Sequence, residues 1–256
     1  MNQVEIDPII ELNVADGIAE VIMNRPAVLN AITRRVRRDL AETFDRLSAD
    51  DDVRVIILGG AGRAFCAGQD QHESASMTAA DAARRIEDYA TLYRAIRNAS
   101  KPVLARVQGY AIGAGLQLAL LADMAFAGRS ARLGMPELER GSASITGSGL
   151  MWPIIGEGAT KQLVLRAERI SAAEAHEMKL IHEVVDDDRL GDRVREFAVM
   201  LAARPPTGFR VTKAWWNRIG DDLFELTMAH AREAHAHNFA SGDFTERARQ
   251  FLERNK

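Results

Sequence analysis

Hydrophobic residues recur along this chain with two different periods, and the order of these periods predicts the fold class. Short runs rich in β-branched residues predict strands over residues 9–14, 18–23, 53–58, 103–107, 124–127 and 181–185. Apolar positions spaced three and four apart predict helices from Thr33 to about residue 47, over 79–98 and over 114–122. Strands and helices therefore alternate as ββα units, which predicts an α/β core.

Local signals support these boundaries. Asp16-Gly17 between the first two strand-like runs predicts a hairpin, and Ser171 followed by Glu174 predicts a capping box at a helix start. The helix opened by Thr33 is expected to turn its arginines to solvent. The two longer helices are expected to bury Val36, Leu40, Phe44, Leu47, Ile86, Tyr89, Tyr93 and Ile96.

Pro205-Pro206 marks a predicted boundary between a core of residues 1–204 and a helical region of residues 205–256. Turn signals at Gly220 and Gly242 divide the second region into three predicted helices. About 50 residues are too few for an independent core, so this region is expected to pack on the core or on a neighbouring subunit. Its histidines are expected to form a solvated or interface face rather than a metal site; they are His230, His235 and His237.

Composition excludes several classes of protein. Of 256 residues, 33 are Lys or Arg and 36 are Asp or Glu, and the net charge of −3 argues against a nucleic-acid partner. The single cysteine, Cys66, cannot form an intrachain disulfide, which is typical of a cytoplasmic protein. The first seven residues lack the features of a signal peptide. The longest charge-free apolar stretch, residues 107–122, is too short and too polar to span a membrane.

Familiar catalytic motifs are absent. No phosphate-binding P-loop pattern occurs, the glycines at 109, 113 and 115 do not have dinucleotide-fingerprint spacing, and no nucleophile-elbow motif surrounds Ser148. Cys66 lies in an apolar run, where a packing role is favoured over that of a nucleophile. No metal site and no cofactor are predicted.

Two glycine-rich segments remain as candidates for chemistry. Residues 63–70 follow a predicted strand, and residues 109–116 lead from a strand into a helix N-terminus. Small residues there let a ligand approach the backbone, and free N–H groups can face an anion. Two N–H groups converging from separate loops form an oxyanion hole. The alternative is that each segment is only a tight turn.

The order and spacing of these segments closely resemble the enoyl-CoA hydratase/isomerase (crotonase) superfamily. The resemblance covers roughly residues 10–256. It includes the segments 24–31, 64–70, 101–115, 136–138, 170–175 and 243–254. It implies a ββα spiral core, a helical C-terminal trimerisation region and CoA thioester substrates, with CoA entering as part of the substrate. A homotrimer or a dimer of trimers is therefore expected.

The resemblance also implies roles for individual residues. The backbone N–H groups of Gln69 and Ala114 would form the oxyanion hole. Glu137 would transfer the proton. Substrate and CoA would be bound along Ala27, Leu29, Ala67, Gly68, Gln69, Asp70, Gly113 and Ala114.

The chain departs from the family's hydratases at Gln117, where many of them carry a second glutamate. An amide cannot take up a proton near neutral pH, and the loss of one acid–base group costs about 10²–10⁴-fold in rate. A single carboxylate suffices to shift a double bond, because the same group removes and returns the proton. Gln117 is therefore expected either to be held by the structure or to position a water or a substrate oxygen. Asp70 and Glu139 are alternative second carboxylates, although a structural or solvated role is favoured for each.

These observations favour enoyl-CoA isomerisation. One alternative is hydration of a 2-enoyl-CoA, with Gln117 positioning the water. A second alternative is a CoA-binding scaffold without catalytic activity.

Overall fold

The strands and helices follow the order that the hydrophobic pattern predicts, and the predicted α/β class is confirmed. The computed structural model describes residues 8–254. Its strands are β1 (Ile10–Ala15), β2 (Ile18–Met23), β3 (Val55–Gly60), β4 (Val103–Val107), β5 (Tyr110–Ile112), β6 (Met124–Gly128), β7 (Arg132–Gly134), β8 (Arg169–Ser171) and β9 (Glu183–Val185). Residues 1–7, on which the expected absence of a signal peptide rests, lie outside the described residues.

Along the chain, the helices either connect the strands or follow the last strand. They are α1 (Arg34–Ala49), α2 (Gln71–Ala75), α3 (Ala79–Arg97), α4 (Ala114–Leu121), α5 (Ile145–Arg166), α6 (Ala172–Glu177), α7 (Leu190–Ala202), α8 (Pro206–Ala240) and α9 (Asp243–Arg254), with short 3-10 turns η1 (Pro26–Val28) and η2 (Asp187–Arg189). Strands β5, β7 and β8 and helices α2 and α5 were not predicted. The three strands are each three residues long, too short to show a period.

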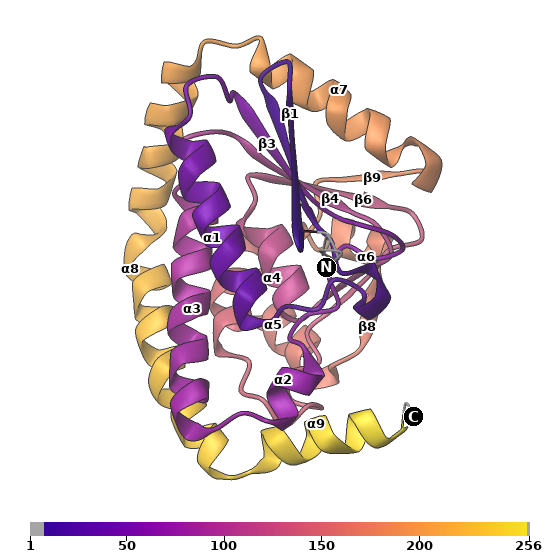
Figure 1. Cartoon of the computed structure of the whole chain (residues 1–256), viewed down its shortest axis with the longest axis vertical. Coiled ribbons are helices and arrows are strands. Elements are labelled where there is room, and N and C mark those ends of the chain that lie inside the picture. Colours follow the sequence, from indigo (N-terminus) through magenta and orange to yellow (C-terminus); the bar gives the residue numbers. More distant parts are fainter. Residues whose placement is uncertain (1–7, 255–256) are drawn as a thin grey trace, which may run out of the picture.

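The main sheet has six strands in the order β1-β2-β3-β4-β6-β9. Only the β1–β2 pair is antiparallel. Helices cover both faces of the sheet, so β3 is buried along its whole length. Val55 and Ile57 pack with α7 on one face, whereas Ile56 and Leu58 join the larger core under α1, α3 and α4. Figure 1 shows α7 apart from those helices, across the far side of the sheet.

The local signals in the sequence produce the expected geometry. Asp16 and Gly17 adopt φ angles of 55° and 73° in the β1–β2 turn. Thr33 caps α1 by accepting a hydrogen bond from the N–H of Val36, and the Ser171 capping box opens α6. The four residues predicted to face inward from each of α1 and α3 are buried.

As far as residue 254, the C-terminal region contains two helices rather than the three predicted. Helix α8 continues through Gly220, which was expected to mark a turn. Packing overrides the weak helix propensity of glycine here. A Cβ at Gly220 would lie 3.3 Å from Nη2 of Arg97, which donates to the carbonyl of Asn217 at 2.5 Å. The predicted turn at Gly242 is present, between α8 and α9.

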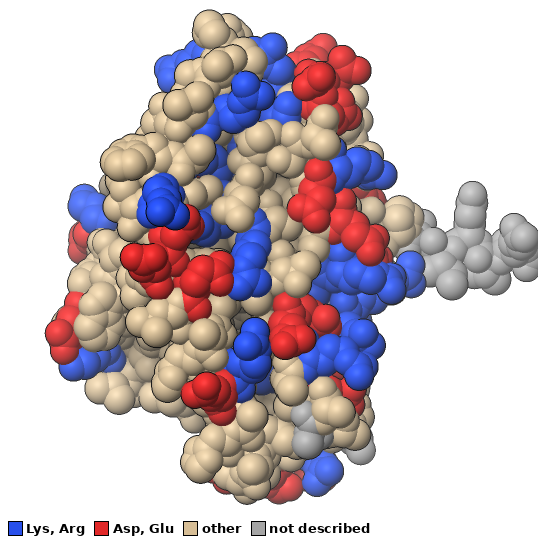
Figure 2. Space-filling view, turned by 90° about the vertical axis from the view of Figure 1, so that its left-hand side faces the viewer, with Lys and Arg blue, Asp and Glu red and all other residues tan. Residues whose placement is uncertain are grey.

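The predicted boundary at 204/205 falls in the short turn between α7 and α8. Beyond it, α8 extends over the height of the molecule and lies alongside α3 for part of its length, and α9 turns back beneath α2 (Figure 1). Ion pairs join α3 to α8, among them Arg94–Glu225 and Arg97–Asp221. Figure 2, which views the side carrying α1, α3 and α8, shows acidic and basic side chains interspersed.

The prediction that the three histidines form a solvated or interface face is wrong for His235, which is 6% exposed and faces Arg85 of α3. Trp215 and Trp216, by contrast, are exposed.

Within residues 8–254, no helix combines the length and the apolar content needed to cross a membrane.

Candidate active site

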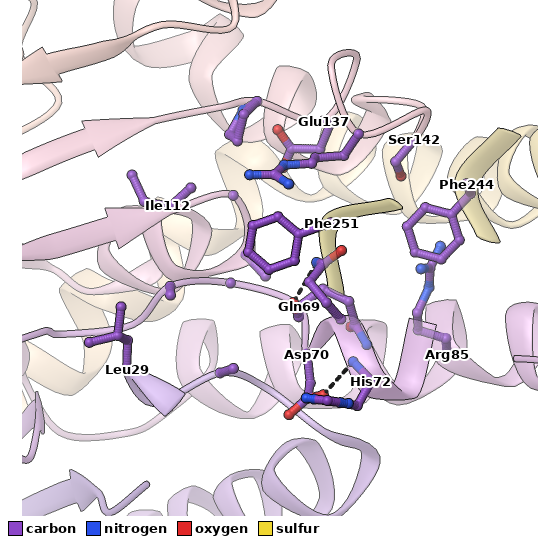
Figure 3. A pocket seen from close by; sticks show the side chains of 18 of the residues that line it. Leu29, Gln69, Asp70, His72, Arg85, Ile112, Glu137, Ser142, Phe244 and Phe251 are labelled. Atoms are coloured by element: carbon purple, nitrogen blue, oxygen red, sulfur yellow. Dashed lines mark hydrogen bonds between the residues drawn. The ribbon is translucent and has the colours of Figure 1, made fainter. Parts of the chain in front are cut away.

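The ten residues predicted to form the site all line one cavity of about 890 Å³. They are Ala27, Leu29, Ala67, Gly68, Gln69, Asp70, Gly113, Ala114, Gln117 and Glu137. The cavity wall also includes side chains from α3, α8 and α9. In Figure 3, Leu29 and Ile112 lie on one side, Ser142, Phe244 and Arg85 on the other, and Glu137 and Gln69 between them.

The two glycine-rich segments are joined through their backbones. Cys66 donates to the carbonyl of Tyr110 at 2.8 Å and accepts from the N–H of Ile112 at 3.0 Å. Gly68 has a φ of 89°, and a Cβ there would lie 2.5 Å from the carbonyl oxygen of Ile112. Only glycine fits at this point. The loop after β3 therefore lies directly against the start of α4.

The backbone geometry leaves two N–H groups available at this junction. Gln69 forms an isolated parallel bridge with Ile32, in which the two hydrogen bonds are made by the carbonyl of Gly68 and the N–H of Asp70. The N–H of Gln69 itself therefore points away from Ile32. Ala114 is the first residue of α4, where N–H groups have no partner within the helix. Neither N–H has an acceptor among residues 8–254. Ala114 has no positive φ, so the alanine side chain causes no backbone strain there.

The Gln69 side chain anchors its loop to three helices. Its Oε1 accepts from Arg37 of α1 at 3.1 Å and from the hydroxyl of Tyr89 of α3 at 2.8 Å. Its Nε2 donates to Glu73 of α2 at 3.0 Å. Arg37 was expected on a solvated arginine face, but it is only 2% exposed. Its burial is stabilised by an ion pair with Glu73 at 2.8 Å.

Glu137 follows β7, and its carboxylate reaches the start of α4. A Cβ at Gly113 would lie 3.1 Å from its Oε1, so the glycine allows this close approach. Oε1 accepts from Nε2 of Gln117 at 3.2 Å, and Oε2 is buried without a partner among the described residues. Burial raises the pKa of Glu137 to about 7. The carboxyl group is therefore suited to both accept and return a proton near neutral pH.

Gln117 is held by the structure on both sides of its amide. Its Oε1 accepts from the hydroxyl of Tyr93 at 2.7 Å and from that of Thr146 at 2.8 Å. Both lone pairs of the carbonyl are thereby used, and the amide nitrogen is directed to Glu137. Two roles were predicted for Gln117, and this geometry favours a side chain that is held by the structure over one that positions a water or a substrate oxygen. Tyr93 was predicted as a core residue only, and no sequence signal pointed to Thr146.

The alternative acids and the cysteine have other roles. Asp70 pairs with Arg25 at 3.0 Å and caps α2 by accepting from the N–H groups of His72 and Glu73. Glu139 is exposed and does not line the cavity. Cys66 is fully buried, and burial raises the pKa of its thiol to about 12. It is therefore a packing residue, as the apolar run indicated.

The segment before α1 is fastened to the loop after β3. Leu29 and Asn30 both have positive φ angles, of 52° and 57°. The Asn30 side chain donates to the carbonyls of Ala61 and Ala64 at 2.9 and 2.8 Å. The carbonyl of Leu29 accepts from the N–H of Ala67 at 2.9 Å. These bonds hold one wall of the cavity in place.

Within the described part of the chain, no group of three His, Cys, Asp or Glu side chains is arranged to hold a metal ion.

Known proteins of similar sequence and structure share this architecture. Residues 13–256 match the family described as enoyl-CoA hydratase/isomerase. The chain is 32% identical to 1,2-epoxyphenylacetyl-CoA isomerase from Escherichia coli (strain K12), over 94% of both chains. It is also 32% identical to (E)-benzylidenesuccinyl-CoA hydratase from Thauera aromatica, over 80% of both. A crystal structure of an enoyl-CoA hydratase from Mycobacterium avium subsp. paratuberculosis K-10 has a TM-score of 0.86 and 27% identity, covering 97% of this chain and 99% of that one.

Proposed function

The chain belongs to the enoyl-CoA hydratase/isomerase (crotonase) family, and on that premise we propose that it moves the double bond of an enoyl-CoA thioester from the β,γ to the α,β position. The resemblance and the crotonase-like fold predicted from the sequence are confirmed by the family match and by the solved structures. The family comprises both isomerases and hydratases, so the two reactions can be distinguished only by the residues of the site.

One observation supports isomerisation most strongly. Glu137 places its carboxylate against the start of α4, and the residue beside it is the amide of Gln117 rather than a second acid. A shift of the double bond needs only one group that removes and returns the proton. Hydration needs a base for water as well as an acid for the α-carbon.

In the proposed reaction, ionised Glu137 removes a proton from the α-carbon. The electron pair of that C–H bond moves toward the thioester carbonyl, whose oxygen gains negative charge. The N–H groups of Gln69 and Ala114 donate to this oxygen, and Ala114 benefits from its place at a helix N-terminus. The protonated Glu137 then returns the proton to the γ-carbon, which leaves the double bond between the α- and β-carbons. Nothing is oxidised or reduced, and CoA enters with the substrate.

Gln117 contributes by positioning in this proposal. Its amide, fixed by Tyr93 and Thr146, donates to Glu137 and so favours the ionised carboxylate. Burial opposes ionisation and is the larger effect, which keeps the pKa of Glu137 near 7. The carboxyl group thus exists in both protonation states during turnover.

The walls of the cavity support the proposed substrate orientation. We assign the CoA moiety to the side of the cavity lined by Ala27, Leu29 and Ala67, and the acyl group to the region beyond Glu137.

We also propose that the protein assembles as a homotrimer or a dimer of trimers. Exposed apolar side chains on α8 support this assembly; they include Val211, Trp215, Ile219 and Leu226.

The experiment is a product analysis with two substrates in D₂O. The protein is incubated with trans-3-hexenoyl-CoA and, separately, with trans-2-hexenoyl-CoA, and the products are identified by chromatography and mass. Isomerisation predicts 2-hexenoyl-CoA from the first substrate. Accumulation of 3-hydroxyhexanoyl-CoA from the second as the faster reaction would assign hydration instead. Binding of both without product or deuterium exchange would assign a scaffold.

A further inference from the structure

A buried arginine that has no carboxylate partner among residues 8–254 lies in the wall of the same cavity. Arg85 of α3 is 6% exposed and lines the cavity. Its Nη2 lies 3.3 Å from Nδ1 of His235, and the ring of Phe244 lies 4.5 Å from its guanidinium carbon. Its Nε atom is buried and has no hydrogen-bond partner among residues 8–254. Within the same residues, no carboxylate oxygen lies within 4.0 Å of its nitrogens.

The groups around Arg85 do not neutralise its charge. Burial, together with the Arg85 charge, lowers the pKa of His235 to about 3, so this histidine is a neutral acceptor. Arg37 carries a charge of the same sign. Glu73, the acidic group whose charge acts on Arg85, is bound to Arg37 at 2.8 Å and to Gln69 at 3.0 Å.

Arg85 nevertheless stays charged. Burial lowers its pKa only to about 10, so the guanidinium is a cation at neutral pH. A buried charge without a partner is costly, and an anion that pairs with it is correspondingly favoured. A neutral histidine and an aromatic face leave donors of the guanidinium unused. The missing partner is therefore expected to come from a molecule that enters the cavity.

The position of Arg85 indicates which part of the substrate it meets. Tyr93, which binds Gln117 beside Glu137, lies on the same face of α3 but eight residues further along. Eight residues of helix span about 12 Å. In Figure 3, Arg85 lies on the opposite side of the cavity from Leu29, where the CoA moiety is assigned. Arg85 thus faces the end of the acyl group that is remote from the thioester.

Building on the proposed function, we propose that Arg85 binds a carboxylate at the far end of the acyl group, so that the substrate is the CoA thioester of a dicarboxylic enoic acid. The planar guanidinium matches a carboxylate with two parallel hydrogen bonds. Ser142 lines the same side of the cavity and offers a hydroxyl donor to the carboxylate. Ile86 and Phe244 line the cavity as well and supply apolar surface for the methylene chain.

The test measures binding of saturated thioesters by calorimetry, so that its result does not depend on isomerisation. Adipoyl-CoA is compared with hexanoyl-CoA, and suberoyl-CoA with octanoyl-CoA, since the members of each pair differ only in a terminal carboxylate. We expect the unmutated protein to bind at least one dicarboxylic thioester about tenfold or more tightly than its partner. Equal affinity, or preference for the methyl-terminated thioester in both pairs, would overturn the proposal even if no variant folded.

Variants separate recognition from structure. Arg85→Met should abolish the preference for the carboxylate while leaving affinity for the methyl-terminated thioester within a few-fold. Arg85→Lys should retain part of the preference, because it keeps the charge but loses the planar fork. Arg94→Met, on the same helix but paired with Glu225, is the matched control and should retain the full preference. If Arg85→Met weakens both thioesters equally, Arg85 only supports the fold and the proposal is wrong.

A failure of the proposed function would look different. In that case the carboxylate preference would persist in binding, whereas trans-3-hexenedioyl-CoA would not be converted to the 2-enoyl isomer.

Discussion

The Nε2 atom of Gln117 lies 3.2 Å from Oε1 of Glu137, and the rest of the Gln117 amide is fixed by two hydroxyl groups. The residue that departs from the family's hydratases is therefore built into a network that orients the remaining acid. Tyr93 comes from α3 and Thr146 from α5, so two elements far apart in the sequence determine where the amide points. The site is organised around one carboxylate.

Glu137→Gln is expected to lower turnover of a 3-enoyl-CoA by about 10²–10⁴-fold, since the amide cannot carry the proton. Thioester affinity should change little, because the oxyanion N–H groups belong to the backbone of other residues. Steady-state rates and calorimetric binding measure the two effects. Glu139→Gln, an exposed position two residues away, is the control and should have normal activity. Retention of turnover in Glu137→Gln would remove Glu137 from the mechanism.

The raised pKa of Glu137 also predicts how stability depends on pH. Because burial raises the pKa to about 7, the folded protein binds this proton more tightly than the unfolded chain does. The contribution is favourable at low pH and is lost as pH rises from about 4.5 to about 7, at a cost of about 3 kcal/mol. Over this window, Glu137→Gln should gain in unfolding free energy relative to the unmutated protein.

Urea denaturation at pH 5, 6, 7 and 8 measures this difference. Subtracting the curve of Glu137→Gln from that of the unmutated protein cancels the other titrating groups. Glu139→Gln, again the control, should follow the unmutated protein at every pH. Parallel curves for Glu137→Gln would show that the Glu137 carboxyl ionises normally.

Ala114→Pro tests the oxyanion N–H directly. Proline is tolerated at the first position of a helix, where its missing N–H has no intrahelical partner. Removing one oxyanion donor is expected to lower kcat by about 10²–10³-fold. Ala114→Gly retains the N–H and should stay within a few-fold of the unmutated rate. A melting temperature measured for both variants separates catalysis from folding. If both variants lose activity equally, the effect is on the fold rather than on the donor.

Local sequence signals predicted those parts of the fold that depend on neighbouring residues. The Asp16-Gly17 turn and the Thr33 and Ser171 caps need only a few adjacent positions, and each was predicted correctly. Helix α8 was divided wrongly at Gly220, where Arg97, which is remote in the sequence, binds Asn217 and Asp221 on either side of the glycine. Burial of Arg37 was missed for the same reason, since Glu73 and Gln69 pair with it only in the fold.

The candidate site was predicted by a combination of two signals. The glycine-rich segments indicated anion-binding loops, whereas Glu137 and Gln117 were found through the family resemblance. Arg85 was missed, although its spacing of four and eight residues from Tyr89 and Tyr93 places it on the same helix face. Thr146 could not be predicted, because only the fold brings α5 beside α4.

The apolar side chains exposed on α8 predict the state of assembly. Val211, Trp215, Ile219 and Leu226 are each more than 60% exposed and recur at helical spacing, which is unusual for a monomer. Light scattering is expected to give three or six times the chain mass of 28.2 kDa. Ile219→Asp should shift the protein toward smaller species, whereas Asn13→Asp on β1 adds the same charge and should not. A mass of one chain at micromolar concentration would refute the trimer.

Gln117→Glu restores the pair of carboxylates that resembles the family's hydratases. The new carboxylate would lie within about 3 Å of Glu137, in the place where the amide now donates a hydrogen bond. Two like charges so close raise the pKa of one group, which then stays protonated and can serve as an acid while the other acts as the base. Tyr93 and Thr146 can still donate to the carboxylate oxygen that replaces Oε1. The variant is therefore expected to gain hydration of a short 2-enoyl-CoA.

The measurement follows the loss of enoyl thioester absorbance and detects the 3-hydroxyacyl-CoA product in both proteins. Gln117→Met, which has a similar length but neither donates to Glu137 nor carries charge, is the matched control and should gain no hydration. It should also lower the isomerisation rate, because Glu137 loses the amide that orients it. If the unmutated protein hydrates as fast as Gln117→Glu, one carboxylate is sufficient for addition of water. The chain would then be an enoyl-CoA hydratase, and the amide at position 117 would not determine which reaction it catalyses.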